Sequence, residues 1–269
     1  MGVLNVTPDS FSDGGTFFSL DRAVTTALAM ERAGADILDI GGESTRPGSR
    51  ATPAAEEIAR VLPVIAALRR RLKIPISIDT RRASVAEIAL GAGAEIVNDV
   101  SGLKHDRALA EVAARHKALI ILMHMRGTPR TMQKTPFAKD VLKSVREGLR
   151  ESVSFARMAG IAKSQIVLDP GIGFGKSYAQ NYELIARLAE LGKLGFPLLV
   201  GTSRKGFIGA TLAEGGRPRP SSERIWGTAA TVAASILNGA HIVRVHDVTE
   251  MVQVARVSDC VLDSRHSPK

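Results

Sequence analysis

The stretch DPGIGFGKS at residues 169–177 has the residue types of a phosphate site, a glycine-rich turn followed by lysine and serine. A nucleotide-binding phosphate loop needs a glycine five residues before its Gly-Lys pair. Here that position is Pro170, which has no N–H to donate. The dinucleotide pattern also fails, because Lys176 stands where its third glycine should be. The stretch therefore needs an explanation other than a nucleotide site, and we expect Lys176 to be a surface lysine.

Polar or charged side chains stand at the end of nearly every apolar run of the chain. They supply carboxylates, amides, cations, a hydroxyl and imidazoles, the groups that bind polar ligands and stabilise charge. Each one alone could simply cap a turn. Their recurrence at run after run predicts one shared active site. The residues are Asn5, Asp39, Asp79, Asn98, His124, Asp169, Ser203 with Lys205, and Arg244 with His246.

Short β-branched apolar runs alternate with longer amphipathic segments from end to end, which predicts alternating strands and helices. The predicted strands cover residues 1–6, 35–42, 74–80, 94–100, 118–124, 165–171, 196–203 and 241–247. The predicted helices lie near 20–33, 54–72, 82–92, 106–116, 138–159, 180–192, 222–238 and 248–260. This α/β order favours a (β/α)8 TIM barrel, a single domain over residues 1–269, with a doubly wound open sheet as the alternative. A barrel places its chemistry at the carboxyl ends of the strands, where the polar residues stand.

Composition narrows the function classes. The net charge of +9 comes from dispersed lysines and arginines, which favours an anionic small-molecule substrate over a nucleic-acid partner. A single cysteine, Cys260, excludes an internal disulfide and a cysteine-rich zinc site, and it favours a reducing, cytoplasmic location. No stretch is long and apolar enough to cross a bilayer, so no membrane partner is expected. The first residues show no secretory signal.

Eight motifs, in order, resemble those of the dihydropteroate synthase family. They are MGVLNVTPDSFSDGG, DIGGESTRPG, SIDT, NDVSG, MHMRGTP, LDPGIGFGK, GTSRKGFIG and RVHDV, and they span residue 1 to about residue 260. The resemblance implies a (β/α)8 barrel and a transferase of folate biosynthesis. That family joins 6-hydroxymethyl-7,8-dihydropterin diphosphate to p-aminobenzoate, releases diphosphate and is the target of sulfonamides. Members usually have residues before the first strand, which here starts at Met1; we expect this to affect stability more than chemistry.

The resemblance also implies a pterin pocket. Its polar members would read the guanidine-like edge of the ring, Lys205 would donate to ring acceptors, and three apolar side chains would form the walls. The implied pterin residues are Asp79, Asn98, Val100, Met123, Asp169, Phe174 and Lys205. Buried acceptors of this kind can reject an analogue that lacks the donor by roughly 10⁴-fold.

Diphosphate is the leaving group of the implied reaction, and its site would be built from Asn5, Arg46, Arg244 and His246. The family uses Mg²⁺, and Asn5 matches its single protein ligand. The implied mechanism is dissociative, with the C–O bond breaking before the amine attacks, and Asp79 would face the developing cation. Asp79, Lys205 and Arg46 are the expected catalytic residues.

By the same resemblance, six residues would surround p-aminobenzoate: Phe11, Thr45, Pro47, Phe174, Ser203 and Lys205. We expect the loops 7–19 and 43–50, rich in Gly, Ser, Asp and Pro, to be disordered without ligand.

His124 stands at a strand end with the other candidates, and two roles are open for it: a residue of the site or a structural support.

Three rival functions stay open at this point. One is a pterin-dependent methyltransferase of the same barrel family, which would use the same pocket. Another is a barrel aldolase in which Lys205 forms a Schiff base. The third is a pterin-binding module without catalysis. A homodimer formed through the later helices is expected from the family.

Overall fold

Eight short strands form the centre of the computed structural model, which describes residues 1–6, 16–44, 52–128, 131–132 and 137–266, the side chains of 16–19 and 265–266 not among them. All eight lie inside the runs where the sequence predicts strands, although they are shorter. They are β1 (Gly2–Asn5), β2 (Leu38–Gly41), β3 (Ile76–Asp79), β4 (Ile96–Asp99), β5 (Leu119–Met123), β6 (Ile166–Asp169), β7 (Leu199–Val200) and β8 (Ile242–Val243).

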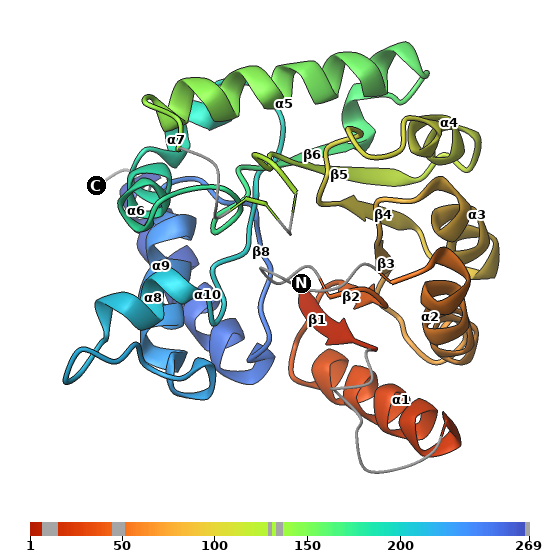
Figure 1. Cartoon of the computed structure of the whole chain (residues 1–269). Helices are drawn as coiled ribbons and strands as arrows, with labels where there is room; N and C mark the ends of the chain where they lie inside the picture. The colour runs from red at the N-terminus through yellow and green to blue at the C-terminus, as the bar shows by residue number, and fades with distance from the viewer. Residues whose placement is uncertain (7–15, 45–51, 129–130, 133–136, 267–269) are drawn as a thin grey trace.

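The strands close into a parallel ring. β1 to β6 pair in sequence order, and β7 pairs with β8. Parallel bridges between Leu168 and Leu198 and between Gly2 and Val245 join the two groups at both edges. Figure 1 shows the strands gathered in the middle with helices around them. The predicted (β/α)8 barrel is therefore confirmed, and the doubly wound alternative is wrong because the strand order never reverses.

Helices follow the strands and cover the outside of the ring (Figure 1). None of the described helices is long and apolar enough to span a membrane. The helices are α1 (Thr16–Arg32), α2 (Ala54–Leu68), α3 (Ala83–Ala92), α4 (Ala108–Arg115), α5 (Val141–Met158), α6 (Tyr178–Ala186), α7 (Leu188–Gly192), α8 (Gly206–Thr211), α9 (Ile225–Leu237) and α10 (Val248–His266), with 3₁₀ turns η2 (Lys163–Gln165) and η3 (Ser221–Glu223).

Three helix predictions need correction. α1 starts at Thr16, inside the segment expected to be irregular. The helix expected over 180–192 is two helices, because the backbone of Arg187 (φ −106°, ψ 21°) leaves the helical region. α8 is not anticipated, since its two glycines weaken the helical pattern. Gly209 is needed there: a Cβ at this position would lie 2.4 Å from Nε of Arg224, which donates to the carbonyl oxygen of Arg219.

Alternating side chains divide the apolar core into two layers. Outward-facing strand residues such as Ile40, Ile78 and Leu122 are fully buried beneath the helices. Inward-facing ones fill the barrel interior: Met1, Ile37, Ile96, Ile121, Val167, Leu199 and Ile242. Each buried aliphatic side chain contributes about 1.5–3 kcal/mol. The apolar interior plug lies near the start of the strands, which leaves their carboxyl ends for polar groups.

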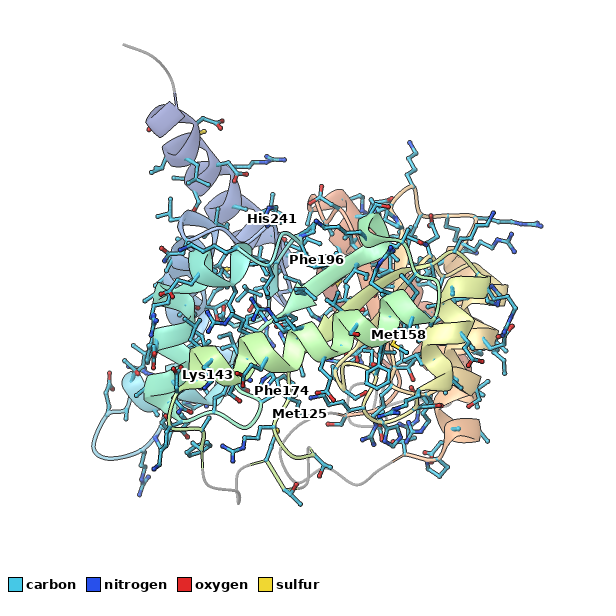
Figure 2. The ribbon with its side chains drawn as sticks, turned by 90° about the horizontal axis from the view of Figure 1, so that it is seen from above. Met125, Lys143, Met158, Phe174, Phe196 and His241 are labelled. Carbon is cyan, nitrogen blue, oxygen red and sulfur yellow. The ribbon has the colours of Figure 1, made fainter. Side chains whose placement is uncertain are left out.

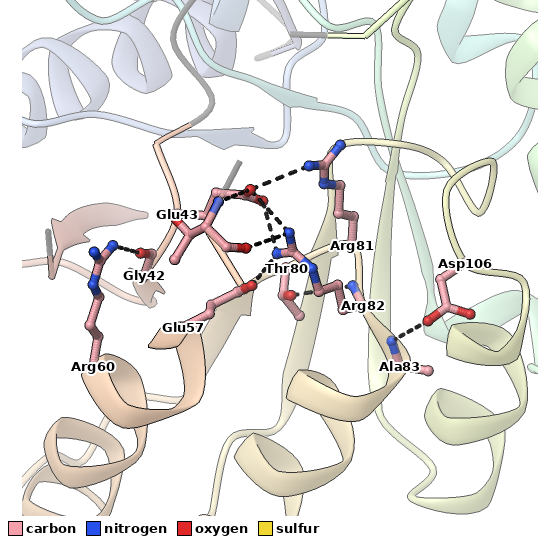
Figure 3. A network of polar contacts seen from close by, with 10 residues as sticks. Gly42, Glu43, Glu57, Arg60, Thr80, Arg81, Arg82, Ala83 and Asp106 are labelled. Atoms are coloured by element: carbon pink, nitrogen blue, oxygen red, sulfur yellow. Dashed lines mark hydrogen bonds and ion pairs between the residues drawn. The ribbon is translucent and has the colours of Figure 1, made fainter. Parts of the chain in front are cut away.

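A charged network fastens α2 and α3 to the end of β2 (Figure 3). Arg82 lies 3.0 Å from Oε2 of Glu43, pairs with Glu57 and donates to the carbonyl oxygen of Thr52 at 2.7 Å. Glu57 is 0% exposed, and burial raises its pKa. Removing one partner of a buried ion pair costs about 3–5 kcal/mol. Arg82 therefore fixes the mouth of the barrel at β2 and β3.

Candidate active site

Side-chain alternation brings the polar strand ends to the mouth of the barrel. Ile96 belongs to the interior plug, so Asn98, two residues later on β4, points into the barrel above it. The same step leads from Val167 to Asp169 on β6. The convergence expected from the sequence is thus produced by the twofold period of each strand.

Arg244, which follows β8, lies between two carboxylates from the N-terminal half of the chain, on β2 and β3. Its Nε donates to Oδ2 of Asp39 at 2.6 Å, and its Nη2 donates to Oδ2 of Asp79 at 2.8 Å. Asp39 also accepts from Ser77 Oγ at 2.6 Å and from Asn98 Nδ2 at 3.0 Å. These five side chains form one polar cluster across β2, β3, β4 and β8.

The cluster contains two carboxylates and one cation. Burial, partly opposed by Arg244 and assisted by the neighbouring Asp39 carboxylate, raises the pKa of Asp79 to about 7. Burial acts against the charge of Arg244, but Asp39 and Asp79 outweigh it and raise the pKa of the guanidinium above its usual range. Arg244 therefore stays charged, while Asp79 can exchange a proton near neutrality.

Asp169 ends β6 and starts the DPGIGFGKS turn. It is 6% exposed, and its Oδ1 accepts a hydrogen bond from Gly171 N at 2.7 Å. Among the described residues, none donates to Oδ2 of Asp169. Burial raises the pKa of Asp169, opposed by the Gly171 hydrogen bond and the charge of Lys205. The arrangement leaves one buried carboxylate oxygen available to a ligand.

Lys205 and Phe174 lie beside the turn that follows Asp169. The Lys205 ammonium donates to the carbonyl oxygen of Ile172 and stands 4.2 Å from the Phe174 ring centroid. Burial lowers the pKa of Lys205 to about 8. In Figure 2, Phe174 lies at the opposite end of the barrel from Phe196 and His241, which precede β7 and β8. Phe174 thus belongs to the same end as the strand-end polar groups.

Ser203, His246 and Asn5 complete the described part of the mouth. Ser203 Oγ accepts from His246 N at 3.2 Å and lies 3.0 Å from its Nδ1. Asn5 is half-buried at the end of β1. A Cβ on Gly41 would stand 3.7 Å from both Asn5 Oδ1 and Asp79 Oδ2, so both oxygens lie near Gly41 at the end of β2.

The expected apolar walls Val100 and Met123 are buried at the ends of β4 and β5. A Cβ on Gly171 would lie 3.2 Å from Cγ of Met123, which places Met123 beside the Asp169 turn.

Four expected site residues lie outside the described part of the chain: Phe11, Thr45, Arg46 and Pro47. The same holds for residues 7–15 and 45–51, on which most of the expected loop disorder falls.

Two residues of the mouth were not assigned a role by sequence reasoning. Asp39 was noted as a strand end, but its pairing with Arg244 requires the ring to close. The prediction that Lys176 is a surface lysine is wrong: it is 2% exposed and lies against His124. A lysine after a glycine-rich turn carries no sequence signal for burial.

Among the described residues, no group of three His, Cys, Asp or Glu side chains could hold a metal ion. The amide oxygen of Asn5 is a ligand type that suits a hard cation taking its other ligands from water and a phosphate. A separate hollow of about 230 Å³, lined by Leu103, Phe155 and Met158 among others, contains none of the strand-end residues.

Known proteins resemble this chain in sequence and fold over nearly its whole length. The sequence profile described as "Pterin binding enzyme" matches residues 1–246. The dihydropteroate synthase of Synechocystis is 53% identical over 261 residues, which cover 97% of this chain and 89% of that protein.

Two solved structures share the fold over nearly their full length. The dihydropteroate synthase of Clostridium difficile, determined in the presence of pteroic acid, has a TM-score of 0.90 at 48% identity and covers 97% of this chain and 95% of its own. The Yersinia pestis dihydropteroate synthase with a sulfonamide drug has a TM-score of 0.91 at 42% identity, covering 98% and 94%.

The titration of Asp79 gives the first testable prediction. The pKa of Asp79 is about 7 in the native state, whereas an aspartate in the unfolded chain ionises near pH 4. Between these two pH values Asp79 stays protonated in the native state but is ionised in the unfolded chain. The resulting contribution to stability is complete below pH 4 and is lost as the pH rises through 7. In Asp79→Asn, urea unfolding between pH 4 and 7 should lack this decline, which amounts to at most about 1.4 kcal/mol per pH unit. The exposed Asp21→Asn variant serves as control. Equal pH slopes in wild type and Asp79→Asn would contradict the shift.

Proposed function

The chain belongs to the pterin-binding enzymes and, within them, to the dihydropteroate synthases, and from this premise we propose how its residues carry out the synthase reaction. The substrates are 6-hydroxymethyl-7,8-dihydropterin diphosphate and p-aminobenzoate, and the products are 7,8-dihydropteroate and diphosphate. The observation that carries the assignment of residues is the buried cluster of Asp39, Asp79, Asn98 and Arg244, with Asp169, at one end of the barrel.

The pterin ring is read by acceptors at the ends of β4 and β6. Asn98 donates through Nδ2 to Asp39, which orients the amide so that its oxygen is left for the ring. Asp169 is held through Oδ1 by Gly171, which leaves Oδ2 for the adjacent N–H groups of the ring. Lys205 supplies a donor, and Val100, Met123 and Phe174 supply apolar surface.

The diphosphate lies toward Asn5, Arg244 and His246, with Arg46 added by resemblance. The guanidinium of Arg244 uses Nε and Nη2 on the two carboxylates, and among the described residues nothing accepts from its Nη1. That group can therefore reach a phosphate oxygen. The side-chain oxygen of Asn5, half-buried at the end of β1, fits the role of protein ligand to Mg²⁺, which takes its other ligands from water and phosphate oxygens. When bound, the ion would neutralise charge on the leaving diphosphate.

The reaction is proposed to be dissociative. The bond between the pterin methylene and its oxygen breaks, and the electron pair leaves with diphosphate. Asp79, close to the site, stabilises the cationic methylene. The amine of p-aminobenzoate then donates its lone pair to that carbon, forms the C–N bond and releases a proton. Arg244 holds the Asp79 carboxylate through its Nη2 group. Arg244 and Lys205 are proposed to supply the positive charges on either side of the reacting carbon.

The p-aminobenzoate site is assigned to Phe174, Ser203 and Lys205, together with Phe11, Thr45 and Pro47. Ser203 follows β7 beside His246, and its hydroxyl can donate either to Nδ1 of His246, 3.0 Å away, or to a carboxylate. Lys205 stands beside Phe174 and can complement the same charge. A sulfonamide would compete at this position.

Because the residues named above come from strand ends around the whole ring, residues 1–269 are proposed to act as one catalytic domain. A homodimer through the later helices is supported by exposed apolar side chains on α9 and α10, namely Trp226, Val257 and Val261. A cytoplasmic location is supported by the single free cysteine.

Diphosphate release is the direct test of the proposed reaction. With both substrates and Mg²⁺, a coupled assay should show release that saturates in p-aminobenzoate and is competed by a sulfonamide. Omitting p-aminobenzoate or chelating Mg²⁺ should reduce the rate to background. Undiminished release without p-aminobenzoate would contradict the synthase assignment.

Asp169→Asn tests pterin recognition. Asparagine keeps a carbonyl oxygen for Gly171 but replaces a charged acceptor with an amide, so pterin affinity should fall about 10- to 100-fold, as expected for a hydrogen bond to a charged group. Isothermal titration calorimetry with the bare pterin measures this. The exposed Asp140→Asn, at the N-cap of α5, should bind normally. Near-normal affinity of Asp169→Asn would remove Asp169 from the pocket.

A further inference from the structure

Lys176 is a buried cation without a carboxylate partner among the described residues. It lies at the end of the turn that follows β6, is 2% exposed and is used by none of the proposed catalytic steps. Burial lowers its pKa to about 7, with Asp169 opposing and Lys205 assisting the shift. Placing an ammonium group here is unfavourable unless its hydrogen bonds are satisfied.

Three acceptors from two separate loops surround the Lys176 ammonium. Its Nζ lies 3.0 Å from the carbonyl oxygen of Phe174, 3.1 Å from that of His124 and 3.1 Å from the Nδ1 of His124. An ammonium has three N–H groups, so each can serve one acceptor. Lys176 therefore ties the end of β5 to the turn after β6.

When Lys176 is charged, its contact with Nδ1 assigns one tautomer to His124, because an ammonium group can only donate. Burial and the charge of Lys176 lower the pKa of His124 to about 3, so the ring is neutral. A neutral imidazole whose Nδ1 accepts a hydrogen bond carries its proton on Nε2. The ring packs against α5 at Gly148, where a Cβ would lie 2.6 Å from its Cδ2.

The same two loops carry groups of the proposed pterin pocket. His124 N donates to the carbonyl oxygen of Asp169 at 2.9 Å. Gly171 (φ +69°) passes so close that a Cβ there would lie 2.0 Å from the His124 oxygen. Phe174, whose carbonyl is held by Lys176, places its ring beside Lys205. Loss of the three Lys176 hydrogen bonds would release both the loop at His124 and the turn that carries Phe174.

We propose that Lys176 is a positioning residue of the pterin pocket: it clamps the β5 and β6 loops together, fixes His124 as its Nε2–H tautomer, and so holds Asp169 and Phe174 against the ring. This inference rests on the proposed function. Lys176 itself touches no reacting atom, so it acts on binding of the pterin rather than on the chemical step.

The test combines a spectroscopic and a kinetic measurement on the whole chain. Lys176→Met removes the three donors at similar length, Lys176→Arg keeps donors, and the exposed Lys163→Met is the matched control. Nitrogen-15 NMR of the histidine rings reports the tautomer, with the His124 signals identified by their loss in His124→Gln. Steady-state kinetics, with diphosphate release as readout, separates KM for the pterin substrate from kcat.

In the wild type at about pH 5–6, where Lys176 is charged and His124 is neutral, Nδ1 of His124 should be unprotonated and Nε2 protonated. Lys176→Met should shift this pattern toward a tautomer mixture and raise KM for the pterin about tenfold, with kcat nearly unchanged, as expected for lost uniform binding. Lys176→Arg should recover part of the loss, and Lys163→Met should match the wild type.

An Nδ1–H tautomer in the wild type would overturn the clamp even if Lys176→Met did not fold. An unchanged KM in a folded Lys176→Met, or a fall in kcat alone, would overturn the positioning role. If the wild type made no dihydropteroate at all, the proposed function would fail, while the NMR pattern would still decide whether the clamp exists.

Discussion

The sharing of one guanidinium between two buried carboxylates organises the mouth of this barrel. Arg244 follows the last strand, while Asp39 and Asp79 come from β2 and β3, and Arg244 and Asp39 are 205 residues apart in the sequence. They meet only because Val245 pairs with Gly2 and closes the ring. Fold closure and site assembly are therefore one event, and a change that opened the ring would also separate these charges.

Burying these charges is costly, and the surrounding groups offset the cost. Ser77 and Asn98 complete the hydrogen bonds of Asp39, so that Asp39 serves as an anchor for Arg244. Burial raises the pKa of Asp79 to about 7. Lys205 and Lys176 provide positive charge near Asp169. Carboxylates and cations are thus gathered at one end of the barrel, which suits a substrate with a polar ring at one end and a diphosphate at the other.

The strands and their polar ends can be predicted from the sequence because the twofold period of a strand is a local pattern. A barrel then places all the strand ends at one mouth. Sequence reasoning missed what depends on contacts across the ring. Lys176 is buried because, besides the nearby Phe174 carbonyl group, the carbonyl group and imidazole of His124, 52 residues away, surround it, and no local pattern encodes that contact. α8 was hidden by Gly209, a residue required by the side chain of Arg224 and not by the helix itself.

The most direct measurement is a crystal structure of the chain with a non-reactive dihydropterin, diphosphate and Mg²⁺. We expect the ring edge to be hydrogen-bonded to Oδ2 of Asp169 and to the Asn98 amide oxygen, with diphosphate next to Arg244 and His246. A pterin bound away from Asp169, or a diphosphate that leaves Arg244 without contact, would contradict this expectation.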